Sequence, residues 1–337
     1  MSTNDSLFEA FLNQHDSKAW DKTVKALAPH IHEVDRAATQ IWFAFFPLDL
    51  MRLLQSAENL EELERKLQLQ GKYFLKDQID SSHEFLYGHA YWPQVKTAVV
   101  EFAESNASPD SLELAAQIRS IANRVALKIG KEESVLIGIT AVAFMTLQQV
   151  GMAAFKTAPG KISANHRISK SSPEKIVEAR KRDDGQGLFG FLRGDRKEFT
   201  VNFNENDPEC KFKLINTQQI TTAAAMDKRD HYLRDPRCTV NEGPIPVQCR
   251  SAACGTCWVG ILGGQEKLSD VSGREGQRIK EFGYIDTDQP KPFIRLACMA
   301  QAFGAVTLVI PPWNGVFGKF LKAQRSGDSE TQAAGTR

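Results

Sequence analysis

The first half of the chain repeats apolar residues at helical spacing, with few prolines or glycines between them. Apolar side chains that recur every three to four residues form one face of an amphipathic helix. Ser108-Pro109-Asp110 is typical of a helix start, and Gly71 and Gly130 are typical of helix ends. The pattern predicts an all-α helical bundle over residues 1–157. The expected helical stretches are 19–54, 60–69, 78–105, 111–129 and 133–156.

In the last third of the chain the pattern becomes alternating. Apolar and polar residues alternate from Phe199 to Phe203, and again around Phe212 and Leu214 after a turn that contains Pro208. Alternation with a period of two predicts half-buried strands, joined here as a hairpin. We therefore expect an α+β domain. Its further elements are expected at 221–226 (helix), 258–262 (strand), 273–282 (helix) and 305–310 (strand).

The composition changes at the borders of these regions. Residues 158–195 are polar and basic and include Pro159-Gly160, which predicts a linker with a short helix over 173–181. After Trp313 most residues are small or polar, which predicts a disordered tail. We therefore predict a multidomain chain. It would consist of a helical domain (1–157), a linker (158–195), an α+β domain (196–312) and a tail (313–337).

The charge balance limits the classes of partner. The 337 residues carry a formal net charge of +1, so the chain as a whole has no excess of Lys and Arg that would favour nucleic acid. The opening Met1-Ser2-Thr3-Asn4-Asp5 has no basic start and no apolar signal core. We expect a cytoplasmic, reducing environment, in which cysteines are kept as thiols for metals or chemistry.

Three cysteines form a tight local motif. Cys249, Cys254 and Cys257 are spaced C-x4-C-x2-C, and Cys298 follows about forty residues later. This is the spacing of plant-type [2Fe–2S] loops, which have a distant fourth cysteine. Apart from Arg250 the intervening residues are small, so the chain can turn tightly and backbone N–H groups can approach the sulfurs. A zinc ribbon, which usually has two separated cysteine pairs, and a disulfide set are both weaker interpretations.

With this motif and this order of elements, residues 196–312 resemble a plant-type [2Fe–2S] ferredoxin, which has a β-grasp fold. The resemblance implies one-electron transfer to or from a redox partner, rather than catalysis on a substrate of its own. It implies a [2Fe–2S] cluster whose iron ligands are Cys249, Cys254, Cys257 and Cys298. Cys210 and Cys238 are then spare thiols.

Two features depart from the family pattern. The gap before Cys298 is about ten residues longer than in plant-type members. The domain is also close to neutral, whereas photosynthetic ferredoxins are strongly acidic, so broad electrostatic steering onto a basic reductase is not expected. No Gly-rich dinucleotide fingerprint follows a predicted strand, which disfavours a fused reductase.

Two neighbours of the cysteines are candidates for tuning the cluster. Arg250 would place a positive charge beside it and favour the reduced form, unless the side chain is simply solvated. Trp258 follows Cys257 and is a candidate electron path, although a tryptophan packed in the core is the simpler interpretation.

The helical region offers a weaker candidate site. His30, His83 and His89 lie near carboxylates and could form a second centre, with haem or a metal ion. A di-iron bundle needs Glu-x-x-His pairs, and the region has none. Ordinary helix histidines, exposed or hydrogen-bonded, are therefore the favoured interpretation.

The stretch 134–155 contains no charged residue and is long enough to span a bilayer. Gln148-Gln149 and two glycines weaken that case, so a buried central helix of the bundle is favoured. If the stretch does span, the basic linker after it would place the ferredoxin-like domain on the cytoplasmic side.

These observations favour an electron-transfer protein whose helical domain serves docking or oligomerisation. Two alternatives stay open: a redox or iron–sulfur sensor, and a two-centre oxidoreductase with haem or metal in the helical domain.

Overall fold

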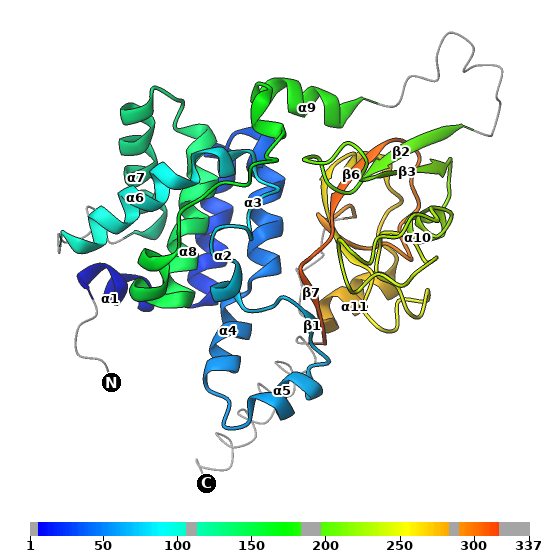
Figure 1. Cartoon of the computed structure of the whole chain (residues 1–337), viewed down its shortest axis with the longest axis horizontal. Coiled ribbons are helices and arrows are strands. Elements are labelled where there is room, and N and C mark those ends of the chain that lie inside the picture. The colour runs from blue at the N-terminus through cyan, green and yellow to red at the C-terminus, as the bar shows by residue number, and fades with distance from the viewer. Residues whose placement is uncertain (1–5, 106–112, 183–196, 283–289, 317–337) are drawn as a thin grey trace. The chain divides into compact units, whose positions relative to one another are not determined.

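The computed structural model describes residues 6–105, 113–182, 197–282 and 290–316, drawn in colour in Figure 1. The chain forms two compact units. Unit 1 contains Met1–Gln55, Phe74–Ala179 and Glu205–Asp207. Unit 2 contains Ser56–Tyr73, Arg180–Asn204 and Pro208–Arg337.

The regular secondary structure in the described part of unit 1 is helical, as predicted. The predicted stretch 19–54 is interrupted at Pro29 and Pro47, since a proline lacks the N–H that an uninterrupted helix needs. The α-helices are α1 (Leu7–Asn13), α2 (Ser17–Leu27), α3 (Glu33–Phe45), α4 (Leu48–Gln55), α6 (Trp92–Glu104), α7 (Leu114–Ile129), α8 (Ser134–Thr157) and α9 (Pro173–Lys181), whose last two residues belong to unit 2. The 3-10 helices are η1 (Ala28–His30), η2 (Leu75–Gln78), η3 (Tyr87–Tyr91) and η4 (Ile168–Lys170).

Helix α8 is the core of unit 1 and packs against α1, α3, α6 and α7 (Figure 1). Its side chains from Val135 to Leu147 are all buried. Among the described residues it is the one helix long and apolar enough to cross a membrane, and most of its apolar stretch is buried inside the protein. Its helical geometry breaks at Gly151, whose φ is 77°. Next to the break, the Met152 N–H donates to the Glu9 carboxylate at 2.7 Å.

The predicted helix over 78–105 is wrong for its first half. Residues between η2 and α6 form turns and η3, and the α-helix starts only at Trp92, with a proline in its first turn. The buried Asp35 carboxylate replaces the missing helical hydrogen bonds, since it accepts the N–H groups of Tyr87 and Gly88, both at 2.7 Å. Gly88 is needed for this contact, because a Cβ there would lie 3.0 Å from Ile139.

Unit 2 is built on a five-stranded mixed sheet, which confirms the predicted α+β class. The strand order is β3-β2-β6-β4-β5, with β2 and β6 parallel and the other pairs antiparallel. The predicted hairpin is β2 paired with β3. The strands are β2 (Glu198–Asn202), β3 (Lys211–Ile215), β4 (Trp258–Gly263), β5 (Ile294–Leu296) and β6 (Val306–Val309), and the helices are α10 (Ile220–Ala224), η6 (Gln265–Lys267) and α11 (Gly273–Phe282).

The structure differs from the predicted boundaries at two places. Residues 56–73, expected in the helical domain, belong to unit 2, where they form α5 (Leu60–Lys66) and β1 (Gln70–Gly71). Strand β1 pairs with β7 (Trp313–Asn314), which was expected to begin the disordered tail. Trp313 is fully buried. Residues 317–337 of the predicted tail and 183–195 of the predicted linker lie outside the described residues.

Candidate metal centre

Sheet register brings the cysteine loop and the distant cysteine together. Strand β4 starts directly after Cys257, and β5 ends two residues before Cys298. The two strands pair with Trp258 opposite Leu296, and the Ala297 N–H donates to the Cys257 carbonyl at 2.9 Å. Cys257 and Cys298 therefore lie at the same end of the sheet.

The backbone of the cysteine loop curls around Cys249. The N–H groups of Ser251, Ala253 and Cys254 point at the Cys249 sulfur, at 3.4, 3.1 and 3.3 Å. Arg250 and Ala252 adopt the left-handed conformation, with φ of 50° and 59°. Residues with a Cβ rarely adopt this conformation, so the loop holds strained backbone. This backbone conformation points several N–H groups toward the Cys249 sulfur.

Hydrogen bonds stabilise negative charge on two of the thiols, Cys249 and Cys298. Burial raises the pKa of the Cys249 thiol, but the hydrogen bonds from Ser251 and Cys254 outweigh it and bring that pKa down to about 6. The Cys257 thiol donates a hydrogen bond to Cys298, which raises the pKa of Cys257 and lowers the pKa of Cys298. Thiolates are the form of cysteine that binds metals. The hydrogen bonds thus favour the metal-binding thiolate form at Cys249 and at Cys298.

The four thiols lie as two pairs with different exposure. Cys249 and Cys254 are half-buried, whereas Cys257 and Cys298 are buried. Among the described residues, no group of three or more His, Cys, Asp or Glu side chains is arranged to hold a single metal ion. An arrangement of two pairs suits a [2Fe–2S] cluster, which takes four cysteines for two irons.

A buried ion pair supports the strand that leads to Cys298. Arg295 donates two hydrogen bonds to the Glu275 carboxylate of α11, at 2.8 and 3.0 Å. Glu275 also accepts the Leu296 N–H at 3.0 Å, and Arg295 donates to the Ser269 carbonyl at 2.8 Å. Both charged residues are at most 1% exposed. The pair therefore fixes β5 to α11 close to the fourth cysteine.

Comparison with known proteins agrees with this geometry. A family model described as a 2Fe-2S iron-sulfur cluster binding domain matches residues 220–302. The C-terminal region is a ferredoxin-type [2Fe–2S] domain. The match confirms the predicted [2Fe–2S] cofactor and a general role in iron–sulfur electron transfer. No curated protein and no solved structure matches the chain.

The two tuning candidates in the ferredoxin domain have different environments. Arg250 is exposed, so water screens its charge. Trp258 is 1% exposed, its indole N–H donates to the Trp313 carbonyl at 3.0 Å, and the two rings lie 5.4 Å apart. Trp258 thus has the contacts of a core residue, and the electron path stays a prediction.

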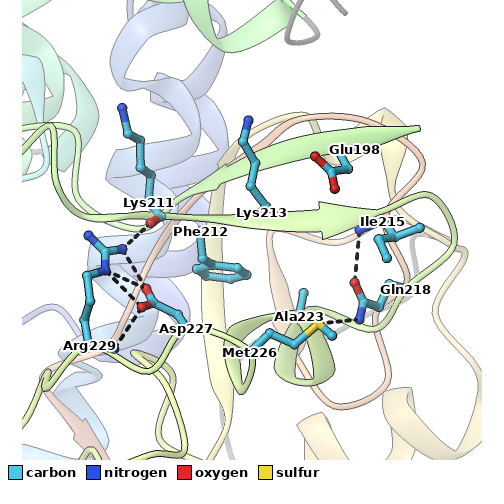
Figure 2. Close-up of a pocket in the computed structure, with 10 residues that line it drawn as sticks. All are labelled: Glu198, Lys211, Phe212, Lys213, Ile215, Gln218, Ala223, Met226, Asp227 and Arg229. Carbon is cyan, nitrogen blue, oxygen red and sulfur yellow. Dashed lines mark hydrogen bonds and ion pairs between the residues drawn. The ribbon is translucent and has the colours of Figure 1, made fainter. Parts of the chain in front are cut away.

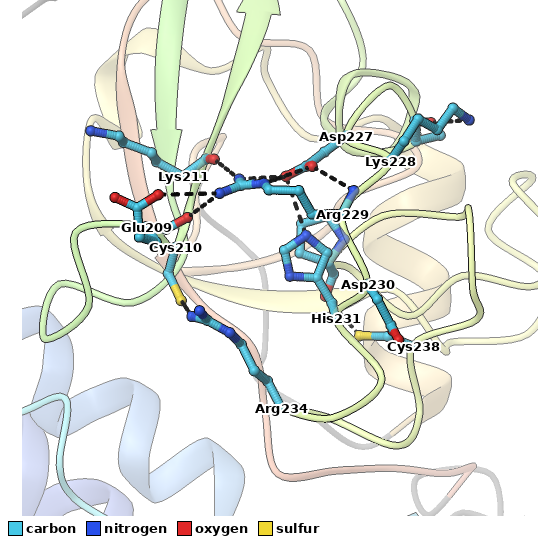
Figure 3. Close-up of polar contacts among 12 residues, drawn as sticks. Glu209, Cys210, Lys211, Asp227, Lys228, Arg229, Asp230, His231, Arg234 and Cys238 are labelled. Carbon is cyan, nitrogen blue, oxygen red and sulfur yellow. Dashed lines mark hydrogen bonds and ion pairs between the residues drawn. The ribbon is translucent and has the colours of Figure 1, made fainter.

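The two spare cysteines have partners away from the loop (Figure 3). Cys210 accepts a hydrogen bond from Arg234 at 2.6 Å, and the Cys238 thiol donates to the Pro244 carbonyl at 3.1 Å. Burial raises the pKa of Cys238 to about 12. Both thiols therefore have protein partners of their own.

Figure 3 also shows a charged cluster in the segment that follows α10. The Asp227 carboxylate accepts hydrogen bonds from Arg229 and from His231, the latter at 3.2 Å. Burial raises the pKa of Asp227, but its hydrogen bonds with Arg229 outweigh burial and hold the pKa at about 2. Arg229 further donates to the carbonyls of Glu209 and Lys211, which joins this segment to the start of β3.

A groove of about 400 Å³ runs along β3, an edge strand of the sheet (Figure 2). Its apolar lining includes Phe212 and Met226. Side chains cover the strand at both ends, because Arg229 donates to the Lys211 carbonyl and Gln218 accepts the Ile215 N–H at 3.0 Å. Covered edges resist pairing with a strand of another chain.

The histidines named as a second centre do not come together as a group of three. His30 is exposed on η1. His83 and His89 are fully buried, and their Nδ1 atoms lie 2.9 Å apart. Their third neighbour is His166, whose ring centre lies 4.7 Å from that of His89. Sequence reasoning missed His166, since it is distant in the chain and carries no local motif. The second centre itself stays a prediction.

Sequence reasoning also missed Glu275 and Arg295. A signal for Arg295 was present, since it is the one charged residue in the apolar run from Phe293 to Ala297. A charge in a buried strand needs a partner. The sequence could not identify that partner, because Glu275 lies on a separate helix.

Proposed function

We propose that this protein carries single electrons between redox proteins, through a [2Fe–2S] cluster held by Cys249, Cys254, Cys257 and Cys298. The observation that carries the proposal is the asymmetry of the thiols, with one pair half-buried and the other buried. Such an arrangement anchors a cofactor inside the domain while one side stays close to the surface. The helical unit would serve docking or oligomerisation.

The residues of the loop would hold the group and set its electron affinity. When bound, a [2Fe–2S] cluster supplies one-electron oxidation and reduction, without bond-making in a substrate. Hydrogen bonds to the ligand sulfurs stabilise added negative charge, so the N–H groups around Cys249 would raise the reduction potential. We therefore propose a carrier, rather than an enzyme with its own substrate.

A partner would approach the exposed side of the loop. Arg250, Ser251 and Ala253 are all exposed beside the half-buried Cys249 and Cys254. Electron transfer between proteins needs a short distance between the two centres, and the Cys257–Cys298 side is shielded by protein. The proposed docking face is therefore the exposed part of the loop between Cys249 and Cys254.

Serine variants of individual cysteines test the ligand assignment. Cys254→Ser and Cys298→Ser should lose the visible absorption of the cluster or shift it markedly, because an alkoxide replaces a thiolate at the iron. Cys210→Ser and Cys238→Ser are matched controls that should keep the wild-type spectrum, since both thiols have protein partners elsewhere. The measurement is the absorption spectrum of anaerobically purified protein. A changed spectrum in the controls alone would contradict the assignment.

A further inference from the structure

Residues 160–170, here called the strap, are fastened to unit 1 by polar contacts. The N–H groups of Gly160 and Lys161 donate to the Asp80 carboxylate at 2.7 and 3.2 Å. The Ser163 N–H donates to His89 Nε2 at 3.1 Å. His166, itself part of the strap, lies 3.1 Å from the Leu86 carbonyl through Nε2. Two of these hydrogen bonds involve imidazole rings.

The hydrogen bonds fix where the protons of these rings lie. Since Ser163 donates to Nε2 of His89, that nitrogen carries no proton, and the proton of neutral His89 is on Nδ1. His89 Nδ1 then donates to His83 Nδ1 at 2.9 Å. His166 Nε2 faces a carbonyl, so it is the donor there. This arrangement requires His83 and His89 to be neutral.

Burial favours the same protonation state. His83 and His89 are fully buried, and His166 is 4% exposed. Desolvation is the largest cause of the lowered pKa of all three rings, and the pKa of His89 falls to about 3. His83 Nε2 and His166 Nδ1 have no hydrogen-bond partner and are buried. A proton added to His166 Nδ1 would thus be a buried charge, and its burial outweighs the backbone hydrogen bonds with Leu86 and Glu84 that favour the charged ring.

The two aspartates near the rings are already engaged. Asp80 also accepts the Trp92 indole N–H at 2.8 Å, and Asp35 accepts two backbone N–H groups. Helix α8 contributes no charged residue between 134 and 155. The titratable and charged groups on the elements around the three rings are Asp35 on α3, Asp80 after η2, Glu84 before η3, Tyr87 and Tyr91 on η3, Lys96 on α6, Lys156 near the end of α8, and Lys161, Arg167 and Lys170 on the strap.

We propose that His89 and His166 form a proton-controlled latch, which releases the strap when each imidazole takes up a proton from solvent. A proton on His89 Nε2 removes the acceptor of the Ser163 N–H. A proton on His166 Nδ1 creates a buried charge that is relieved when the strap leaves. His83 packs against Trp92, with ring centres 4.1 Å apart, and stays behind when the strap opens.

The linkage between proton uptake and opening sets how steeply the opening equilibrium of the strap depends on pH. A histidine exposed by opening regains a pKa of about 6.5, so below that pH each released ring raises the opening equilibrium about tenfold per pH unit. Two rings released together give about a hundredfold per pH unit. Global unfolding would also expose His83 and give a steeper dependence.

Hydrogen exchange of the full-length, cluster-loaded protein tests the latch between about pH 7.5 and about pH 5. After correction for intrinsic exchange, peptides from the strap should show an opening constant that rises about a hundredfold per pH unit below about pH 6. His89→Gln and His166→Gln keep groups able to make the same hydrogen bonds but do not titrate. Each should reduce the dependence to about tenfold per pH unit.

His30→Gln is the matched control, because His30 is exposed and lies outside the strap contacts. It should leave the wild-type dependence unchanged. The proposal is overturned if the opening constant of the strap in the wild type does not change with pH. It is also overturned if both His89→Gln and His166→Gln keep the wild-type dependence of the opening constant on pH. If one variant does not fold, the other still provides the test.

Discussion

At the scale of single residues, the buried ion pair between Glu275 and Arg295 ties the strand before Cys298 to helix α11. A buried ion pair contributes little net stability compared with apolar residues, but removing one partner leaves a buried, uncompensated charge. Arg295 is 0% exposed and lies three residues before Cys298. Loss of Glu275 should therefore disturb β5 and the fourth cysteine together.

Glu275→Gln should lower the free energy of unfolding by about 3–5 kcal/mol, because a neutral amide cannot compensate the buried guanidinium. Glu281→Gln is the control, since the pair of Arg278 and Glu281 on the same helix is partly exposed. It should cost less than about 1 kcal/mol. Urea unfolding measures both. Equal losses in the two variants would show that the pair at Arg295 has no special role.

The residues of the cysteine loop could be predicted from sequence because their spacing is local. Cys249, Cys254 and Cys257 lie within nine residues of chain, and the residues between them are small apart from Arg250. The contacts of Cys298 depend on the pairing of β4 with β5, which the sequence does not state. Residue-scale reasoning therefore predicted four ligands, but it did not predict the ion pair that supports β5.

At the scale of elements, α8 shows how composition alone leaves two interpretations open. An apolar helix that is hydrophobic on all sides fits either a bundle core or a membrane. In unit 1 it is surrounded by helices, and Ala143 is 0% exposed. A small residue at such a position leaves no space for a larger one.

Ala143→Leu should therefore destabilise the protein by about 1–3 kcal/mol through overpacking. Ala153→Leu, at an exposed position of the same helix, should change stability by less than about 0.5 kcal/mol. Thermal unfolding of both variants makes the comparison. If Ala143→Leu is as harmless as Ala153→Leu, the helix does not have the packed surroundings described above.

Elements that depend on distant side chains were the ones that sequence patterns missed. The apolar spacing of residues 78–91 suits a helix, yet Asp35 captures the N–H groups of Tyr87 and Gly88. Strand β2, β3 and helix α11 were predicted correctly, because alternation and helix length are local signals. Hydrogen bonds to a buried carboxylate that is distant in the chain thus override the local preference for a helix.

At the scale of the whole molecule, the ferredoxin domain is completed by a segment from the first quarter of the chain. Strand β1 pairs with β7, the Lys72 N–H donates to the Pro312 carbonyl at 2.7 Å, and the Val316 N–H donates to the Leu67 carbonyl at 2.8 Å. Leu67 and Trp313 are both fully buried. The sequence could not show this, because the two segments lie far apart in the chain.

A fragment of residues 180–337 should therefore unfold with a free energy at least about 2 kcal/mol lower than the same fragment joined through a flexible linker to residues 56–73. The linked segment covers apolar surface around Trp313 that is otherwise exposed to water. Urea unfolding of the two fragments measures the difference. Equal stability would show that the segment is not part of the folded domain.

The central claim is that the ferredoxin domain holds a [2Fe–2S] cluster that accepts one electron. The most direct measurement is the electron paramagnetic resonance spectrum of full-length protein, purified anaerobically and recorded before and after reduction with dithionite. We predict no signal from the oxidised cluster and, after reduction, a signal of about one unpaired electron per chain that disappears on reoxidation. A protein that contains zinc, has no visible bands and gives no signal after reduction would contradict the account.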